Sequence, residues 1–293
     1  MRLVVLRALG LGDLLTGVPA LRALARAFPD HERVLLAPAA LRPLVALMGD
    51  AVHDVIDTAG ARRLPDRLSE RAPRHADLAV NLHGRGPRST DLLRDLGPRR
   101  LIAFGIQARW DDDEHETARW CRLLGLAGIS CDPDDLDIAA PAGPPPHPGA
   151  TVIHPGAAAP ARRWPAERWA AVARAVPAPV VVTAGPGEER LARAVAADSG
   201  AKVFAGHVGA LAALVAGARR VLCADTGVAH LATAIGTPSV VLFGPTPPAR
   251  WGPPADRPRH RVLWAGHVGD PNGDATDPGL LALQPRHVLE AIA

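Results

Sequence analysis

A polar triplet in the second half of the chain could bind a ligand. Asp225, Thr226 and Gly227 lie between the apolar run RRVLCA and the helical pattern VAHLATAI. Parallel α/β sheets bind ligands outside the carboxyl ends of their strands, so such a triplet is a candidate site. Because a helix beginning there presents unpaired N–H groups, the sequence favours an anion such as phosphate beside Thr226 and Gly227.

Other loops of the second half follow neighbouring apolar runs. His154 begins a HPG loop, Arg162 stands in ARRWP, and Gly185 and Glu188 lie in GPGEER. The planar guanidinium of Arg162 suits a second phosphate. Glu188 offers a carboxylate to ribose hydroxyls, and Gly185 would lie beside it at the nucleoside. His154 would support its loop, as Gly10 and Gly12 would in the first half of the chain. Together these types predict a site for a nucleoside diphosphate.

Each of these residues also has a purely structural interpretation. Gly185 is a common turn residue, and Glu188 could be a first-turn acid that interacts with the helix dipole. Asp225 or Thr226 could cap a helix, and His230 could be a buried helix histidine. Their predicted convergence at one edge of one sheet favours a binding site, which would include His230 on the helix.

A glycine-rich loop also follows the first apolar run, RLVVL. It contains Gly10 and Gly12, but Leu15 stands where a dinucleotide fingerprint requires a third glycine. The second strand also lacks the acid that binds ribose in that fingerprint, so a nicotinamide or flavin cofactor is disfavoured. Asp13 has two interpretations: an N-cap that accepts backbone N–H groups, or a general base that takes a proton from an incoming hydroxyl.

The elements that position these loops alternate between strands and helices. Strands are predicted at residues 2–6, 33–37, 52–56, 77–82 and 101–104, and then in TVIH, PVVVTA, AKVF, RRVLCA and SVVLF. Short apolar strands alternating with helices are typical of parallel sheets covered on both faces. We therefore expect an α/β protein with two Rossmann-like domains facing across a cleft.

A proline- and glycine-rich segment, PAGPPPHPG at residues 141–149, interrupts this alternation and predicts an interdomain linker. The expected organisation is an acceptor-side domain at 1–143, a donor-binding domain at 149–280 and a C-terminal helix at 281–293.

Composition limits the classes of function. The 293 residues include 33 basic and 30 acidic ones, and the arginines are scattered, which gives no support to nucleic-acid binding. The three cysteines, Cys121, Cys131 and Cys223, have no CxxC spacing, so neither a disulfide framework nor a zinc site is expected. A cytoplasmic location follows. The sequence contains no apolar run of the ~18 residues that a membrane span needs, and it leaves peripheral membrane association open.

Acidic residues cluster in WDDDEHE at residues 110–116. We interpret this run as the start of a solvated helix, and since the histidines lack paired spacing, no metal is expected. Trp164 and Trp169, which flank a predicted helix start, are expected to pack in a core.

The longest of these segments resemble a known family. LRALGLGDLLTGVPALRALARAFPD, HPGAAAPARRWPAERWAAVA, TAGPGEER and ADTGVAHLATAIGTPSVVLFGPTPPARWGP are similar, in this order, to segments of glycosyltransferase family 9, the family of the lipopolysaccharide heptosyltransferases. NLHGRGPRS and HETARWCRLLGLAG also fit the style of that family.

The resemblance implies a GT-B fold, no cofactor, and inverting, metal-independent transfer from a nucleotide-sugar donor such as ADP-heptose. The acceptor would be a cell-envelope glycan or a small metabolite. Asp13 would be the catalytic base and Glu188 would hold the nucleoside. The donor-binding residues would be Asp225, Thr226, Gly227 and His230, together with Arg162.

The sequence departs from the family pattern at two places. Arg162 stands at the position of a lysine that binds donor phosphate, and Ala157, Ala158 and Ala159 replace hydroxyl-bearing residues. Two other functions therefore stay open: a GT-B sugar-nucleotide epimerase, which needs no second sugar, and a non-catalytic nucleotide-sugar-binding homologue.

Overall fold

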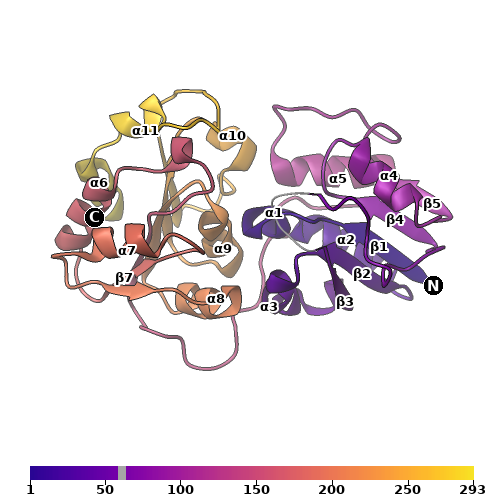
Figure 1. Ribbon diagram of the computed structural model, residues 1–293, viewed down its shortest axis with the longest axis horizontal. Coiled ribbons are helices and arrows are strands. Elements are labelled where there is room, and N and C mark those ends of the chain that lie inside the picture. Colours follow the sequence, from indigo (N-terminus) through magenta and orange to yellow (C-terminus); the bar gives the residue numbers. More distant parts are fainter. Residues whose placement is uncertain (59–63) are drawn as a thin grey trace. The chain divides into compact units, whose positions relative to one another are not determined.

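The computed structural model describes residues 1–58 and 64–293. The chain divides into two compact units, residues 1–139 and 140–293, and each has its own sheet with helices on both faces (Figure 1). The division lies just before the proline-rich segment 141–149. The predicted α/β class with two parallel sheets is confirmed, and the units are described separately below.

The sheet of the first unit has five parallel strands in the order β3-β2-β1-β4-β5. The strands are β1 (Arg2–Leu6), β2 (Glu32–Ala37), β3 (Asp54–Asp57), β4 (Leu78–Asn81) and β5 (Arg100–Ile102). All pairings are parallel; β1, for example, pairs with β2 from Arg2 opposite Glu32. The chain runs outward from β1 to β3 and then crosses back to β4, so the strand order reverses between β1 and β4.

Helices cover both faces of this sheet. They are α1 (Leu11–Thr16), α2 (Val18–Ala27), α3 (Arg42–Val45), α4 (Arg88–Arg94) and α5 (Glu116–Leu126), with 3-10 turns η1 (Ala39–Leu41) and η2 (Ala46–Ala51). Because strand side chains alternate between faces, Val4 and Leu6 pack in a cluster with Leu93 of α4. Leu3 and Val5 face the other way, toward Leu21 of α2.

The sheet of the second unit has six parallel strands in the order β11-β10-β9-β6-β7-β8. The strands are β6 (Thr151–His154), β7 (Val180–Thr183), β8 (Lys202–Phe204), β9 (Arg220–Ala224), β10 (Ser239–Phe243) and β11 (His260–Trp264). Here the order reverses between β6 and β9. β11 was not predicted from the sequence, because the polar residues of this edge strand hide its apolar pattern.

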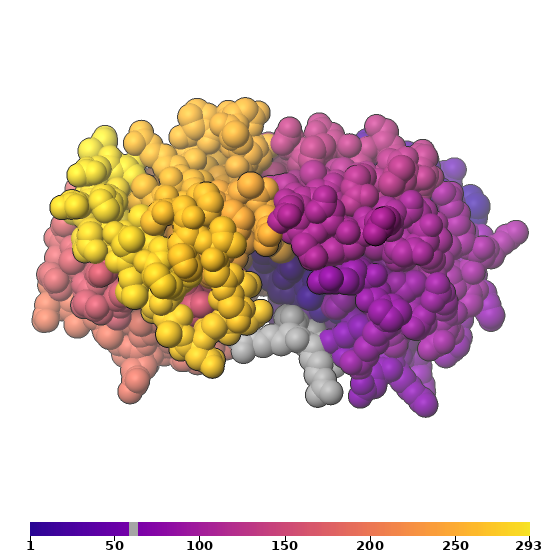
Figure 2. Space-filling model, turned by 90° about the horizontal axis from the view of Figure 1, so that it is seen from above, coloured from indigo at the N-terminus to yellow at the C-terminus, as the bar shows by residue number. Residues whose placement is uncertain are grey.

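The helices of the second unit are α6 (Ala166–Ala175), α7 (Glu189–Ala196), α8 (Val208–Ala216), α9 (Gly227–Ile235), α10 (Pro248–Trp251), α11 (Pro278–Ala282) and α12 (Pro285–Ile292), with the 3-10 turn η3 (Pro160–Arg162). Ile153 and Leu222 pack in one core cluster with Trp169 of α6 and Val288 of α12. The last residues of the chain thus complete the second unit, and Figure 2 shows them in yellow on its surface.

Two tryptophans lie in this core as predicted. Trp164 and Trp169 are buried and meet edge to face at 4.8 Å between ring centroids. The indole N–H of Trp164 also donates to the carbonyl oxygen of Leu283 at 3.1 Å. This bond joins the segment before α6 to the segment before α12, so both rings serve packing.

One sequence expectation is wrong. Cys121 of α5 and Cys131 form a disulfide, whereas the spacing of the cysteines had suggested none. Cys223, on β9, is a buried free thiol. Pairing across a helix end depends on the return of the chain after α5, which sequence spacing does not encode.

Within the described residues, no helix is both long and apolar enough to cross a bilayer.

Candidate functional site

The loop after β1 carries the candidate base. α1 begins at Leu11 with Gly10 as its N-cap and Asp13 in its third position, so the interpretation of Asp13 as the N-cap is wrong. The Asp13 carboxylate instead reaches back to accept the N–H of Gly10 at 3.2 Å. Gly12 lies beside it in the first turn, and the short loop leaves the carboxylate at the carboxyl end of β1.

The Asp13 carboxyl group lies in a low-dielectric setting. Its burial raises its pKa above the ordinary value, the nearby Arg7 guanidinium lowers it, and the Glu116 carboxylate raises it. Burial is the largest of these effects. A carboxylate with a raised pKa accepts protons more readily than a solvated one, which suits a general base.

Arg7 was not predicted from the sequence as a site residue, although it directly follows an apolar strand. Its side chain is fully buried. The guanidinium donates to the carbonyl oxygens of Asp13 and Leu82, and to the hydroxyl of Thr16 at 2.9 Å. It also lies 3.3 Å from a carboxylate oxygen of Glu116. Arg7 therefore ties together the segments that follow β1 and β4.

His83 follows β4, the neighbour of β1 in the sheet. Burial, together with the smaller effect of the Arg7 charge, lowers the pKa of His83 to about 4. Its Nδ1 atom is buried and, among the described residues, has no hydrogen-bond partner. His83 is therefore neutral at neutral pH, because protonation would place a second cation beside Arg7.

Three acids of residues 110–116 are paired with arginines. Asp112 lies 3.4 Å from Arg85, and Glu114 lies 2.7 Å from Arg122. Glu116 is only 4% exposed, so the prediction of a solvated helix start is wrong for this residue. Across residues 1–58 and 64–293, no three His, Cys, Asp or Glu side chains are grouped as a metal site would require.

In the second unit, the loops after β6 and β7 meet around one carboxylate. Glu188 accepts the N–H of Gly185 at 2.9 Å. A Cβ atom at Gly156 would lie 2.0 Å from a carboxylate oxygen of Glu188, so only glycine allows this close approach. Glu188 is the N-cap residue of α7, and the first-turn acid of that helix is Glu189. Glu188 therefore lies just before the first turn, and its carboxylate is still at the positive end of the helix dipole.

His154, the last residue of β6, interacts electrostatically with the Glu188 carboxylate. Its Nδ1 atom lies 3.0 Å from the hydroxyl of Thr183, the last residue of β7. Burial lowers the pKa of His154, while the charge of Glu188 acts in the opposite direction. The buried imidazole is neutral and links the ends of the two strands beneath the carboxylate.

The loop after β9 places the DTG triplet next to these loops, because β9 is the neighbour of β6. Asp225 is buried, and its N–H donates to the carbonyl oxygen of Leu242 at 3.0 Å. Thr226 is the N-cap residue of α9, and its side chain does not cap the helix in the described structure. Gly227 is the first helical residue. The first N–H groups of α9 thus point to the carboxyl edge of the sheet.

His230 and Arg162 lie in the same unit. The ring of His230 meets that of Trp251 at 5.8 Å between centroids. Arg162 ends η3, whose Ala161 bonds through its backbone to Gly273 and Asp277 at 3.1 Å each. The Nε atom of Arg162 is buried and has no hydrogen-bond partner among the described residues. This donor is suited to an anionic ligand.

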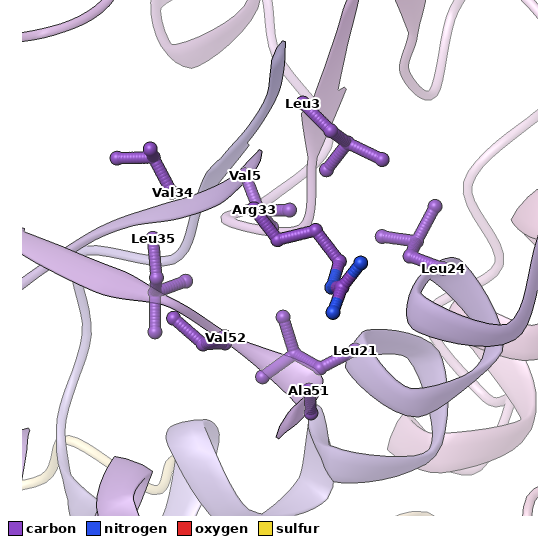
Figure 3. Close-up of a pocket in the computed structure, with 9 residues that line it drawn as sticks. All are labelled: Leu3, Val5, Leu21, Leu24, Arg33, Val34, Leu35, Ala51 and Val52. Carbon is purple, nitrogen blue, oxygen red and sulfur yellow. The ribbon is translucent and has the colours of Figure 1, made fainter. Parts of the chain in front are cut away.

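A hollow in the first unit does not belong to this site. It lies between β1, β2 and α2, where the Arg33 side chain extends toward Leu21 and Leu24 (Figure 3). The guanidinium of Arg33 donates to the carbonyl oxygens of Phe28 at 3.0 Å and Asp50 at 2.7 Å. The hollow leaves no room for a water molecule. Arg33 is thus a structural residue at the amino end of β2.

Solved structures share this fold over the whole chain. The Escherichia coli ADP-heptose lipopolysaccharide heptosyltransferase II has a TM-score of 0.79 and 20% identity, with 100% of this chain and 97% of that chain covered. A glycosyltransferase family 9 protein from Veillonella parvula has a TM-score of 0.78 and 20% identity, with 99% and 96% covered. Heptosyltransferase WaaC of E. coli, solved with ADP, has a TM-score of 0.71 and 19% identity, with 100% and 99% covered. A comparison with curated proteins gives no match.

Two parallel α/β units with polar loops at the carboxyl edges of their sheets share the GT-B fold of these structures. Residues 132–272 match the model of glycosyltransferase family 9 (heptosyltransferase). This half of the chain is therefore similar to family 9, as its motifs indicated. The matched residues include the HPG, GPGE and DTG loops.

The environment of His83 gives a testable consequence. Its imidazole is expected to titrate near pH 4 in the folded protein, against about 6.5 in the unfolded chain. The unfolded state then binds more protons between these values, so the free energy of unfolding falls as pH drops from 6.5 to 4. NMR of the His83 ring measures the pKa, and urea denaturation measures the stability. His83→Asn should flatten the pH dependence, whereas His207→Asn, at an exposed helix cap, should not. Titration of His83 above pH 6 would contradict this account.

Proposed function

We propose that the chain is an inverting, metal-independent glycosyltransferase. It moves a sugar from a nucleoside-diphosphate donor such as ADP-heptose to a hydroxyl of a cell-envelope glycan or a small metabolite. The observation that carries the proposal is the carboxyl edge of the second sheet. There the Glu188 carboxylate lies against Gly156 and Gly185, and α9 begins at Thr226 in the next loop.

The geometry of this edge suits a nucleoside diphosphate. Glu188 is held by the Gly185 N–H through one oxygen, and carboxylates pair well with the vicinal hydroxyls of ribose. The N–H groups at the start of α9 favour a phosphate beside Thr226 and Gly227. Arg162 has an unpaired buried Nε donor to offer a second phosphate. In this proposal Asp225 and His230 border the donor phosphates and sugar.

The departures from the family pattern are compatible with this assignment. Arginine at position 162 keeps the positive charge of a lysine and adds a second donor direction. The three alanines after Gly156 remove hydroxyl groups, so phosphate binding depends more on backbone N–H groups. The leaving diphosphate would be stabilised by Arg162 and the start of α9, which meet its charge as a metal ion would.

The base belongs to the first unit. In the proposed reaction, Asp13 accepts the proton of the acceptor hydroxyl while that oxygen attacks the anomeric carbon. The bond from this carbon to the phosphate oxygen breaks on the opposite face, so configuration inverts and a nucleoside diphosphate leaves. The raised pKa of Asp13 supports this role, because a buried carboxylate gains from taking up the proton.

The donor class is tested by thermal shift on the full-length protein. ADP at 100 times its dissociation constant should stabilise the protein by about 2.7 kcal/mol. AMP, which lacks the second phosphate, should stabilise it less at the same concentration. If ADP, GDP and UDP all leave the melting temperature unchanged, a nucleoside-diphosphate donor is ruled out.

The role of Asp13 is tested by Asp13→Asn. This change should lower acceptor-dependent release of nucleoside diphosphate by about 10²–10⁴-fold, since it removes the base. Binding of ADP, measured by calorimetry, should stay unchanged because Asp13 is not a donor contact in this proposal. Asp91→Asn, at an exposed ion pair with Arg94, is the control that should keep activity. Near-normal turnover of Asp13→Asn would show that another group is the base.

The contact between Gly156 and Glu188 is tested by Gly156→Ala. The new Cβ would displace the flexible carboxylate from Gly185 with little cost in stability. Loss of that charged hydrogen bond should weaken ADP binding by about 10-fold. In a Glu188→Ala background, Gly156→Ala should have no further effect. Gly125→Ala, where a Cβ meets open space, is the matched control. Additive losses in the double variant would contradict the contact as the cause.

A further inference from the structure

Glu116 is a buried carboxylate held between two buried arginines. One oxygen lies 3.3 Å from Arg7 and accepts the indole N–H of Trp120 at 2.8 Å. The other oxygen bonds to the guanidinium of Arg119. Glu116 is 4% exposed and Arg7 is fully buried. Two cations and one indole donor therefore hold the carboxylate in place.

Arg7, one of the two arginines that Glu116 contacts, also contacts the backbone of Asp13. Arg7 donates through Nε to the carbonyl oxygen of Asp13. The hydroxyl of Thr16 donates to the same carbonyl at 3.0 Å, and Arg7 donates to that hydroxyl at 2.9 Å. The position of α1 is thus fixed by the guanidinium, and the guanidinium is fixed in part by Glu116.

This proximity has an electrostatic cost for a base. A cation beside a carboxylate stabilises its charged form and makes it a weaker proton acceptor. Arg7 acts on Asp13 in this direction, and Glu116 acts in the opposite one. Because Arg7 and Glu116 lie in contact, their fields partly cancel at Asp13. Arg7 can then hold the loop through hydrogen bonds without strongly weakening the base.

We propose that Glu116 is a positioning residue that neutralises Arg7 and so keeps the Asp13 carboxylate an effective proton acceptor. The inference rests on the proposed role of Asp13 as the base. It assigns a function to α5, whose first residue is Glu116 and whose next turn supplies Arg119 and Trp120. In this proposal, Glu116 at the start of α5 influences the Asp13 carboxylate by neutralising Arg7.

The charged groups around Asp13 come from three elements. Arg7 faces it from the end of β1, and Glu116 faces it from α5. His83, after β4, faces Arg7 and is neutral above about pH 4. Arg119 faces Glu116 from the next turn of α5 and donates to the carbonyl oxygens of Asp111 and Glu114, at 2.8 Å each through Nη2.

The test measures the titration of Asp13 directly, by ¹³C NMR of carboxyl-labelled full-length protein. The Asp13 signal is assigned by its loss in Asp13→Asn. Glu116→Gln keeps the shape of the side chain and removes its charge, so the pKa of Asp13 should fall by about one unit. Glu116→Asp, which keeps the charge, should leave it closer to the wild-type value. Glu114→Gln, at the Arg122 pair, is the matched control without an effect. An unchanged pKa in Glu116→Gln would overturn the proposal.

A second variant covers the case in which Glu116→Gln does not fold, since it leaves buried arginines without their partner. Arg7→Gln combined with Glu116→Gln removes both charges and leaves burial as the main influence on Asp13. The pKa of Asp13 should then be equal to or above that of the wild type. A value clearly below the wild type in this double variant would also overturn the proposal.

Activity provides an independent readout. In Glu116→Gln, the acid limb of the pH profile of kcat/KM should move to lower pH, and the plateau should fall because the base is weaker. A purely structural role would lower the plateau without moving the limb. The NMR titration needs neither donor nor acceptor, so it stands or falls separately from the proposed transfer reaction.

Discussion

The reversal of strand order in each sheet is the constraint on which the candidate site residues of each unit depend. In parallel sheets all carboxyl ends lie at one edge, and where the order reverses, the chains leaving two neighbouring strands diverge to opposite faces. In the first unit this point lies between β1 and β4, whose following segments carry Asp13 and His83. In the second unit it lies between β6 and β9, whose following segments carry Gly156 and Thr226.

The candidate residues of the two units have buried charges in related arrangements. In the first unit, the Arg7 guanidinium satisfies backbone carbonyl oxygens, and Glu116 balances its charge. In the second unit, the Glu188 carboxylate is held by a backbone N–H above a neutral, buried His154. Charged groups in a dry setting interact strongly and are costly when unpaired. Fixed partners therefore keep the Glu116 and Glu188 carboxylates in place.

Glycine has a specific function at Gly156. The Glu188 carboxylate occupies the space that a Cβ atom at position 156 would take. The carboxylate of the loop after β7 therefore packs directly on the backbone of the loop after β6. At the neighbouring β9, the first turn of α9 presents backbone N–H groups rather than side chains. Much of the proposed donor site is thus made of backbone, which explains how alanines can follow Gly156 without destroying it.

The sequence by itself determined the α/β class, most of the strands and the second-half loops, because short continuous apolar runs and glycine-rich breaks are local signals. It also showed Asp13 and Glu188 as residues worth examining, although not how they are held. Tertiary structure decided the rest: the edge strand β11, the Cys121–Cys131 disulfide and the burial of Arg7 against Glu116. These features join residues that are far apart in the chain or beyond a helix end. Their free energies come from desolvation and pairing in a shared environment, which no local pattern of residue types can encode.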